Sequence, residues 1–191
     1  MKGNEWFNPS AEGLIENLGA ILPYYPLVKK TDDGMYFFWP PGREHYHLLA
    51  YFASMVPSGS KILEIGTRSG VSAISMRAGN KDISITTCDL ENTFIGHESI
   101  DFRQINGLDL MEEFKDCPFI FIDVDPHDGV QERVMIAKLK EVGFKGILVL
   151  DDIKLNQDMC DFWNEIDVEK YNFTNFGHHS GTGVVNFGSM Y

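Results

Sequence analysis

From residue 44 onward, short apolar runs alternate with segments whose apolar residues recur every three or four positions. The short runs predict strands that are buried on both faces, and the spaced segments predict helices. Such alternation is typical of a parallel sheet with helices on both sides. The predicted strands span 61–65, 83–88, 102–105, 119–124 and 146–150, and the predicted helices span 44–55, 71–77, 107–114, 130–142 and 157–166.

The two ends of the chain follow other patterns. Towards the C-terminus, the segments 171–176 and 183–187 are separated only by a turn, which predicts an antiparallel hairpin at the sheet edge. Towards the N-terminus, helical spacing predicts a helix over 10–22, which Pro23 ends. The segment 23–41 is rich in proline and aromatic residues. We expect an irregular arm or lid that packs on the domain, lines a substrate pocket or forms an oligomer contact.

The stretch 61–76 combines a buried strand, a glycine turn and the start of a helix. Gly66 and Gly70 bracket the turn and let the backbone approach a ligand, and free N–H groups at the helix N-terminus face that ligand. The pattern therefore predicts a nucleotide-binding loop. Its candidate contacts are Glu64, Gly66, Thr67, Arg68, Ser69, Gly70 and Ser72.

A chain of 191 residues with no internal repeat or linker is expected to form one domain over 1–191. Residues 1–43 would supply the N-terminal helix and the aromatic arm, and 44–191 the core. The predicted fold class is α/β: a Rossmann-like, doubly wound, mostly parallel seven-stranded sheet with an antiparallel C-terminal hairpin.

Composition narrows the partners and the location. The formal net charge of −12 argues against nucleic acid or an anionic membrane as the main partner. Three scattered cysteines are too few for a disulfide framework or a cysteine zinc site, which favours a reducing compartment. The sequence has no signal-peptide pattern and no apolar run of the roughly 18–20 residues that a membrane span needs, so we expect a cytoplasmic protein.

Polar residues follow each predicted strand, and ligands of open α/β sheets bind at these strand ends. Asp89 lies about twenty residues past the glycine turn, where an acidic side chain accepts hydrogen bonds from a ribose diol. The alternative is that Asp89 caps a helix. Arg68 stands where the dinucleotide pattern Gly-x-Gly-x-x-Gly has its second glycine, and an acid-rich pocket suits a cationic cofactor better than a diphosphate. Both features argue against NAD.

A second acidic cluster follows the fourth and fifth predicted strands. Asp123, Asp151 and Asp152 are expected within a few ångström of one another, because they end adjacent strands. Unpaired carboxylates repel and raise one another's pKa values, and a divalent cation relieves the repulsion. Oxygen ligands favour Mg²⁺, Mn²⁺ or Ca²⁺ over zinc. The alternative is that Asp125, Asp151 or Asp152 simply caps the following helix.

These motifs resemble those of class I S-adenosylmethionine-dependent methyltransferases. Residues 64–72, Glu-Ile-Gly-Thr-Arg-Ser-Gly-Val-Ser, look like motif I of that class. They are closest to the small metal-dependent O-methyltransferases of the catechol and caffeoyl-CoA type, which also lack the middle glycine. Residues 121–125 and 148–152 resemble that family's two metal-bearing strand ends, and 123–129 with 146–153 also resemble the macrocin-type and cephalosporin-hydroxylase-like group. The resemblance runs from about residue 44 to residue 187.

The resemblance implies S-adenosylmethionine as cofactor, a divalent cation such as Mg²⁺, and a small hydroxylated molecule as methyl acceptor. The methionine part of the cofactor would contact Gly66, Thr67 and Gly70. The metal would be held by Asp123, Asp151 and Asp152. Asp89 would bind the ribose, and Asn106 with its neighbour Gly107 would flank the adenine. Leu90 and Asp123 are further candidate cofactor contacts.

Two positions depart from the family pattern. Asp152 stands where the family often has asparagine, which makes the site more anionic. Pro126 replaces the lysine that follows the metal-binding aspartate in the catechol and caffeoyl-CoA enzymes. His127 is the nearest replacement as general base, and its titration range suits the role; a surface turn residue is the alternative. The candidate catalytic residues are thus His127 and Asp123, in an in-line attack of a deprotonated hydroxyl on the sulfonium methyl.

Two further functions stay open at this point. A Rossmann-type nucleotide-dependent oxidoreductase would need the Gly-x-Gly-x-x-Gly loop, which is absent. A non-catalytic cofactor-binding relative is favoured by the missing lysine and opposed by the three carboxylates. The acceptor is not readable, because specificity in this fold lies in the arm and the last loops. His178 and His179 would line the acceptor pocket, supply a second base, or simply form a turn, and the aromatic arm would allow a homodimer.

Overall fold

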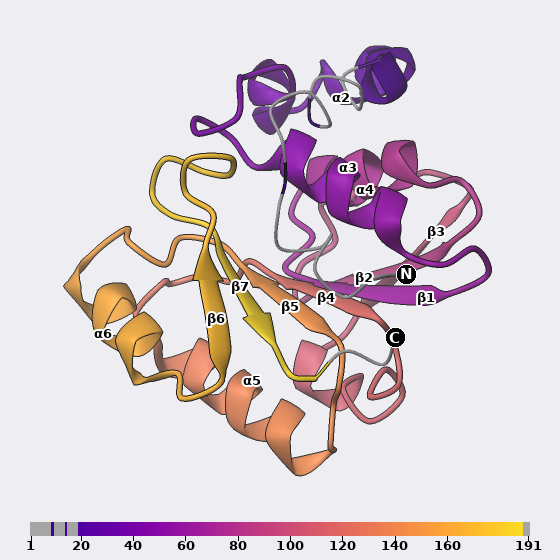
Figure 1. Ribbon diagram of the computed structural model, residues 1–191. Helices are drawn as coiled ribbons and strands as arrows, with labels where there is room; N and C mark the ends of the chain where they lie inside the picture. The colour runs from indigo at the N-terminus through magenta and orange to yellow at the C-terminus, as the bar shows by residue number, and fades with distance from the viewer. Residues whose placement is uncertain (1–8, 10–13, 15–18, 189–191) are drawn as a thin grey trace.

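A twisted sheet forms the centre of the molecule (Figure 1). The computed structural model describes residues 9, 14 and 19–188. Within these residues the sheet has seven strands in the order β3-β2-β1-β4-β5-β7-β6. The strands are β1 (Lys61–Ile65), β2 (Ser84–Asp89), β3 (Ile100–Gln104), β4 (Phe119–Ile122), β5 (Ile147–Leu150), β6 (Glu169–Asn172) and β7 (Gly183–Asn186).

Strands β1 to β5 pair in parallel, and β7 is antiparallel to both of its neighbours, β5 and β6. The predicted mostly parallel sheet with an antiparallel C-terminal hairpin is therefore confirmed. Strand order reverses at β1, which lies between β2 and β4. The carboxyl ends of β1 and β4 consequently meet at the switch point, where open α/β sheets bind their ligands.

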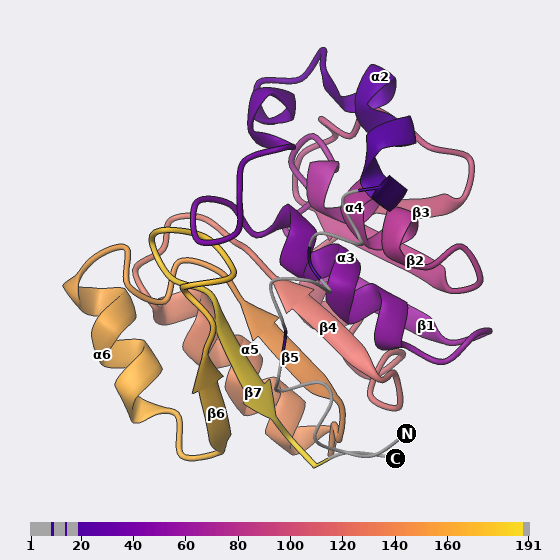
Figure 2. The same ribbon diagram turned by 45° about the horizontal axis from the view of Figure 1, so that its top comes forward.

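Helices cover the two faces of the sheet, with α3 and α4 on one side and α5 and α6 on the other (Figures 1 and 2). Gly79 lets α3 and α4 pack closely, because a Cβ atom there would lie 2.0 Å from the carbonyl oxygen of Ala50. The larger helices are α3 (Tyr46–Met55), α4 (Val71–Gly79), α5 (Val130–Glu141) and α6 (Gln157–Glu165). None of the helices in 19–188 is long and apolar enough to cross a membrane.

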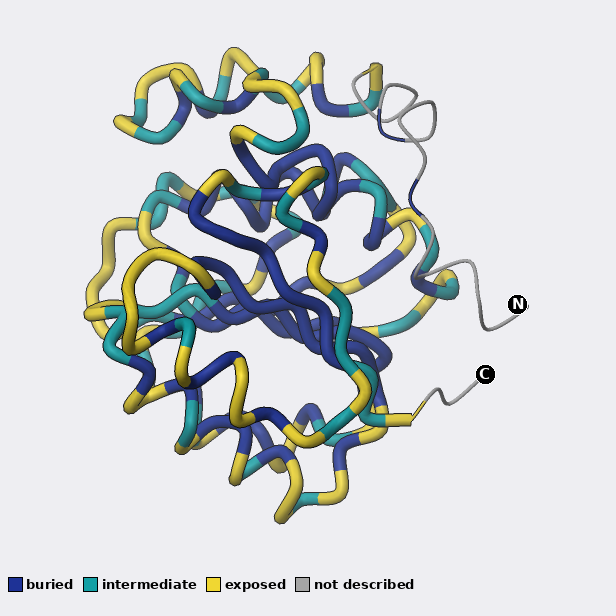
Figure 3. The backbone as a smooth tube through the Cα atoms, turned by 60° about the vertical axis from the view of Figure 1, so that its left-hand side comes forward, coloured by how far each residue is buried: buried dark blue, intermediate teal, exposed yellow. Residues whose placement is uncertain are grey.

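The core is split into two layers by the sheet, because alternate residues of a strand point to opposite faces. Ile62 and Phe121 pack towards α3 and α4, whereas Leu63 and Ile122 pack towards α5 and α6. The strands are dark blue at the centre of Figure 3, which marks them as buried, with exposed segments outside. Burial on both faces explains why these strands read as continuous apolar runs.

The N-terminal arm packs over α3 and α4, and not at the free edge of the sheet (Figure 2). Within the arm, the side chains of Val28 and Phe37 are fully buried, whereas that of Trp39 is 39% exposed. Packing on the domain is thus confirmed for part of the aromatic set. Its short elements are η1 (Leu22–Tyr24), α2 (Tyr25–Val28) and η2 (Asp33–Tyr36). Leu14 and 19–21 are helical, and the rest of the predicted helix over 10–22 lies outside the described residues.

The predicted helix over 107–114 is wrong. Only η3 (Gly107–Asp109) forms, and turns follow it. The side chains of Leu110, Met111 and Phe114 extend from these turns into the core and are buried there. These apolar residues therefore recur at helical spacing although no helix forms. The predicted first strand of the hairpin, 171–176, is also wrong in its bounds, because β6 covers Glu169–Asn172. Residues 173–177 form a turn instead, in which the N–H groups of Phe176 and Gly177 donate to the carbonyl of Phe173.

Candidate functional site

The loop after β1 crosses the switch point and is shaped by its two glycines. Gly66 has φ +95°, and a Cβ there would lie 1.6 Å from the carbonyl oxygen of Asp123. Gly70 has φ +85° and is the residue before α4; a Cβ there would lie 2.4 Å from the ring of Phe94. Both positions therefore need glycine, for backbone conformation and for space. The loop consequently lies directly against the end of β4.

Asp89, at the end of β2, holds this loop in place. One carboxylate oxygen accepts hydrogen bonds from the N–H groups of Thr67, at 2.9 Å, and Arg68, at 2.8 Å. The Thr67 hydroxyl lies 2.5 Å from that of Thr87 on β2. The predicted strand-end position of Asp89 beside the loop is thus correct, and its ribose contact stays a prediction. The carboxylate caps loop N–H groups rather than a helix.

Glu64 is a fully buried carboxyl group beneath the loop. It accepts a hydrogen bond from the hydroxyl of Thr87, while its Oε1 atom has no hydrogen-bond partner among the described residues. Burial raises the pKa of Glu64 from 4.5 to about 7, and hydrogen bonding with the side chains of Ser72 and Thr87 only partly opposes this rise. A buried oxygen without a partner is costly, and a donor from a bound ligand would satisfy it.

The arm reaches the same loop through Asp33. Its carboxylate accepts a hydrogen bond from the hydroxyl of Ser69, at 2.8 Å, and lies 3.2 Å from the guanidinium of Arg68. Arg68 adopts φ +46°, and its carbonyl accepts a hydrogen bond from the hydroxyl of Thr93 at 2.8 Å. Sequence reasoning did not connect the arm with this loop, because nothing in the spacing of the two segments relates them.

The other predicted cofactor residues lie on the neighbouring loops. Leu90 follows β2 and is 70% exposed. Asn106 follows β3 and its side chain accepts a hydrogen bond from the N–H of Leu108. Gly107 packs against Ile65, whose side chain would lie 2.3 Å from a Cβ there. Ser72 is buried in the first turn of α4. Their contacts with a cofactor remain predictions.

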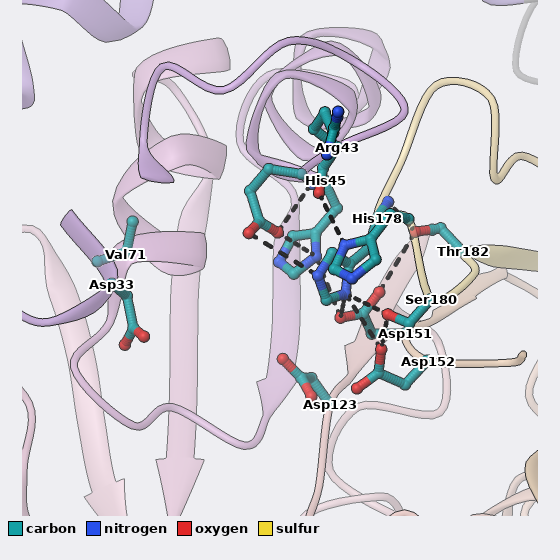
Figure 4. Close-up of polar contacts among 12 residues, drawn as sticks. Asp33, Arg43, His45, Val71, Asp123, Asp151, Asp152, His178, Ser180 and Thr182 are labelled. Atoms are coloured by element: carbon teal, nitrogen blue, oxygen red, sulfur yellow. Dashed lines mark hydrogen bonds and ion pairs between the residues drawn. The ribbon is translucent and has the colours of Figure 1, made fainter. Parts of the chain in front are cut away.

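The three predicted metal ligands lie at the ends of β4 and β5, joined there by histidines (Figure 4). Asp151 and Asp152 are buried, and Asp123 is half-buried. In the described residues, four groups bring one donor atom from each member within 4.8 Å of one another, and every group contains a histidine. The groups are Glu44, His45 and His178; His45, Asp123 and Asp151; Asp123, His127 and Asp152; and Asp151, Asp152 and His178.

Two histidines face one oxygen of Asp151. The Nδ1 atoms of His45 and His178 each lie 3.2 Å from Asp151 Oδ2. His45 Nδ1 is also 3.2 Å from Glu44 Oε1, and His178 Nδ1 is 3.1 Å from Asp152 Oδ1. His45 directly precedes α3, and His178 lies in the loop before β7. Segments far apart in the sequence therefore meet at Asp151.

His127 occupies the other side of Asp152. Its Nε2 atom lies 3.4 Å from Asp125, 3.5 Å from Asp152 and 4.0 Å from Asp123. The residue has φ +55°, and its carbonyl accepts a hydrogen bond from the side chain of Asn156. The predicted catalytic pair, His127 and Asp123, therefore lies together at the end of β4.

The charged groups of this cluster shift one another's pKa values. Burial lowers the pKa of His45, but the charges of Asp151 and Glu44 outweigh it and bring that pKa to about 9. Burial likewise lowers the pKa of His178, and its hydrogen bonds to Asp151 and Asp152 raise it to about 11. Burial raises the pKa of Asp151, but the two histidines hold it well below its usual value.

Asp123 shows the opposite behaviour. Burial and the adjacent negative charge of Asp151 raise the pKa of Asp123 well above its usual value. The cluster thus places one strongly ionised carboxylate, Asp151, beside one that holds its proton more tightly. Glu44 and His45 were missed as site residues. The available signal was a Glu-His pair at the start of an otherwise apolar helix.

Solved structures share this fold, although no protein-family profile and no curated protein sequence matches the chain. The methyltransferase PaMTH1 of Podospora anserina, bound to SAH, superposes with a TM-score of 0.62 at 14% identity, over 87% of this chain and 87% of that chain. The O-methyltransferase TomG of Streptomyces achromogenes, in complex with SAM, gives a TM-score of 0.55 at 18% identity, over 74% and 78%.

A third structure is MycE, a methyltransferase from the mycinamycin biosynthetic pathway, in complex with Mg, SAH and mycinamycin VI. It gives a TM-score of 0.55 at 15% identity, over 75% of this chain and 49% of that chain. At these identities the likeness is one of fold. The chain has the Rossmann-like fold of class I S-adenosylmethionine-dependent methyltransferases.

Proposed function

We propose that this protein is an S-adenosylmethionine-dependent methyltransferase that methylates a hydroxyl group of a small molecule with the help of a divalent cation. The observation that carries the proposal is the loop after β1 together with Glu64 beneath it. The loop crosses the switch point with Gly66 packed against the end of β4, and Glu64 Oε1 is buried without a hydrogen-bond partner among the described residues. The ammonium group of a methionine moiety would supply the missing donor.

The residues around the loop fit this cofactor. Gly66 and Gly70 let the loop pack against the end of β4 and the ring of Phe94, which holds the loop at the switch point. Asp89 keeps one carboxylate oxygen on the loop, and its Oδ1 accepts a hydrogen bond only from the N–H of Glu91, at 3.2 Å, among the contacts of the described residues. Oδ1 therefore retains lone-pair capacity for a ribose hydroxyl.

The donors at the ends of β4 and β5 fit a divalent cation. Asp123, Asp151 and Asp152 supply carboxylate oxygens, with histidine nitrogens beside them. A cation bound there would supply Lewis-acid polarisation of the acceptor hydroxyl. The chain itself would orient the acceptor, exclude water, and accept the proton of the acceptor hydroxyl. His127 Nε2 is the proposed proton acceptor, because it faces this edge between Asp123 and Asp152.

The acceptor is proposed to bind beside the arm. Trp39 and Tyr36 form an edge-to-face pair with centroids 4.7 Å apart, and Trp39 is 39% exposed. Aromatic surface of this kind suits a small, partly apolar hydroxylated molecule. A homodimer through the same surface and a cytoplasmic location also remain proposals.

Calorimetry with S-adenosylmethionine and with NADH tests the cofactor. We expect S-adenosylmethionine to bind and Glu64→Gln to weaken that binding, with the exposed Glu98→Gln as matched control. Formation of S-adenosylhomocysteine is then measured with a panel of catechols and glycosides. Binding of NADH but not S-adenosylmethionine would establish an oxidoreductase-type site instead. Binding unaffected by Asp123→Ala, without turnover of any acceptor, would establish a non-catalytic relative.

A further inference from the structure

We propose that Asp33 of the arm is an internal competitor of the cofactor. Its carboxylate occupies, on Ser69 and Arg68, the place that the carboxylate of the methionine part would take, so this contact has to break before S-adenosylmethionine binds. The inference rests on the proposed function, because it concerns the same cofactor loop. It adds to that function a contact that lowers the affinity of the protein for its own cofactor.

The loop after β1 holds the carboxylate of Asp33 through both of its oxygen atoms. The hydroxyl of Ser69 donates to Oδ2 at 2.8 Å, and a guanidinium nitrogen of Arg68 lies 3.2 Å from Oδ1. A hydroxyl and a guanidinium group placed in this way can receive any carboxylate, because both are hydrogen-bond donors. The side chain of Asp33 is only 14% exposed, so this carboxylate-binding place is filled and largely shielded from water.

This place lies where the proposed cofactor would bring its own carboxylate. Ser69 and Arg68 belong to the turn that crosses the switch point directly before α4. The carboxyl group of Glu64, the proposed partner of the cofactor's ammonium group, lies within hydrogen-bonding reach of Ser72 in the first turn of α4. The ammonium and carboxylate groups of a methionine moiety are bonded to the same carbon atom. Both groups would therefore meet this one short stretch of chain.

The backbone of Arg68 is fixed independently of Asp33. Its φ of +46° lies in the left-handed region, which is costly for a residue with a side chain. Asp89 accepts a hydrogen bond from the N–H of Arg68, and the hydroxyl of Thr93 donates to its carbonyl. Strained residues that the surrounding structure holds in place are concentrated at ligand-binding sites. Arg68 therefore stays in position to receive a ligand carboxylate when Asp33 leaves.

The contact of Asp33 with the loop is weak enough for a ligand to replace it. The side chain of Arg68 is largely exposed, and ion pairs at exposed positions contribute little to stability. Within the part of the chain that the structure describes, the hydrogen bond of Asp33 to Ser69 is the only one that links 22–39 to 44–188. The Asp33 side chain can therefore turn away without loss of backbone hydrogen bonds, while the ring of Phe37 stays packed against that of Tyr46.

Two other roles for Asp33 fit the same distances, and each predicts a different effect of removing its carboxylate. A simple anchor of the arm predicts unchanged affinity for S-adenosylmethionine. A direct ligand of the ammonium group predicts weaker affinity, and a competitor predicts tighter binding. S-adenosylmethionine carries a net positive charge, so loss of a nearby negative charge alone would also weaken binding. Figure 4 shows Asp33 apart from the aspartates and histidines at the ends of β4 and β5, so its removal leaves that cluster intact.

Titration calorimetry with the full-length chain tests the inference. We expect Asp33→Ala to bind S-adenosylmethionine about three- to tenfold more tightly than the wild type, because the contact keeps only part of the wild-type molecules competent to bind. Asp32→Ala is the matched control, since it removes the same charge from an exposed neighbour whose side chain does not cap η2. Circular dichroism checks folding, and Asp33→Asn, which keeps the size of the side chain, replaces Asp33→Ala if the latter unfolds.

Decarboxylated S-adenosylmethionine, which lacks only the carboxylate, identifies the group that competes with Asp33. Tighter binding of S-adenosylmethionine by Asp33→Ala, without tighter binding of the decarboxylated compound, would support the inference. Four results overturn it: unchanged affinity of Asp33→Ala for S-adenosylmethionine, weaker affinity, an equal increase for both compounds, or an equal increase in Asp32→Ala. Failure of the proposed function is distinguishable, because neither the wild type nor Asp33→Ala would then bind S-adenosylmethionine at all, and the inference would be rejected with it.

Discussion

Replacing Glu64 by glutamine should stabilise the ligand-free protein while weakening its cofactor binding. The pKa of Glu64 rises from 4.5 in the unfolded chain to about 7 in the fold, because the carboxyl group is buried. At about 1.4 kcal/mol for each pH unit, this rise corresponds to about 3 kcal/mol. Between pH 4.5 and about 7 the unfolded chain has lost the proton and the folded chain keeps it, so stability falls as pH rises.

Urea unfolding at pH 5, 6, 7 and 8 measures this effect. Glutamine carries no charge, so the gain of Glu64→Gln over the wild type should be small at pH 5 and approach about 3 kcal/mol at pH 8. For Glu98→Gln, on an exposed loop, the stability difference from the wild type should not increase with pH. The reasoning is refuted if the gap between wild type and Glu64→Gln stays constant across this pH range. An accompanying loss of S-adenosylmethionine affinity would link the buried charge to function.

Three other substitutions test separate parts of the structure. Gly79→Ala should destabilise the protein by about 1–3 kcal/mol in urea unfolding, because the new Cβ would meet the carbonyl of Ala50 at 2.0 Å; an unchanged midpoint would contradict this packing. Asp33→Ala should change stability by less than about 1 kcal/mol, since Arg68 is 77% exposed, but should change cofactor affinity measured by calorimetry. His127→Ala should lower methyl transfer by roughly 10²–10⁴-fold with unchanged cofactor binding; a full rate would exclude it as the base.

Local patterns predicted the parallel part of the fold well. The apolar run at 61–65 matches β1 residue for residue, because a strand buried on both faces leaves a clear signal. Gly66 and Gly70 marked the loop correctly, since their left-handed backbone is a local property. The same local reasoning failed for 107–114, where Phe114 and its neighbours reach the core from turns.

The site was only half visible in the sequence. Asp151 and Asp152 directly follow a strand, so their place at the sheet edge could be predicted. The approach of His45 and His178 to Asp151 depends on how α3 and the loop before β7 fold back over that edge. No spacing rule encodes such a long-range approach, and therefore the sequence did not predict that these two histidines lie beside Asp151.

The reversed direction of β7 has a consequence for the order in which the protein is made. A nascent chain that ends before residue 178 already contains the loop after β1 and all three aspartates, but it lacks the His178 imidazole. It also lacks β7, which pairs with β5 along its length, so β5 presents an open edge to other chains. Synthesis of this last part of the chain thus brings His178 to the aspartates at the ends of β4 and β5 and also covers the open edge of β5.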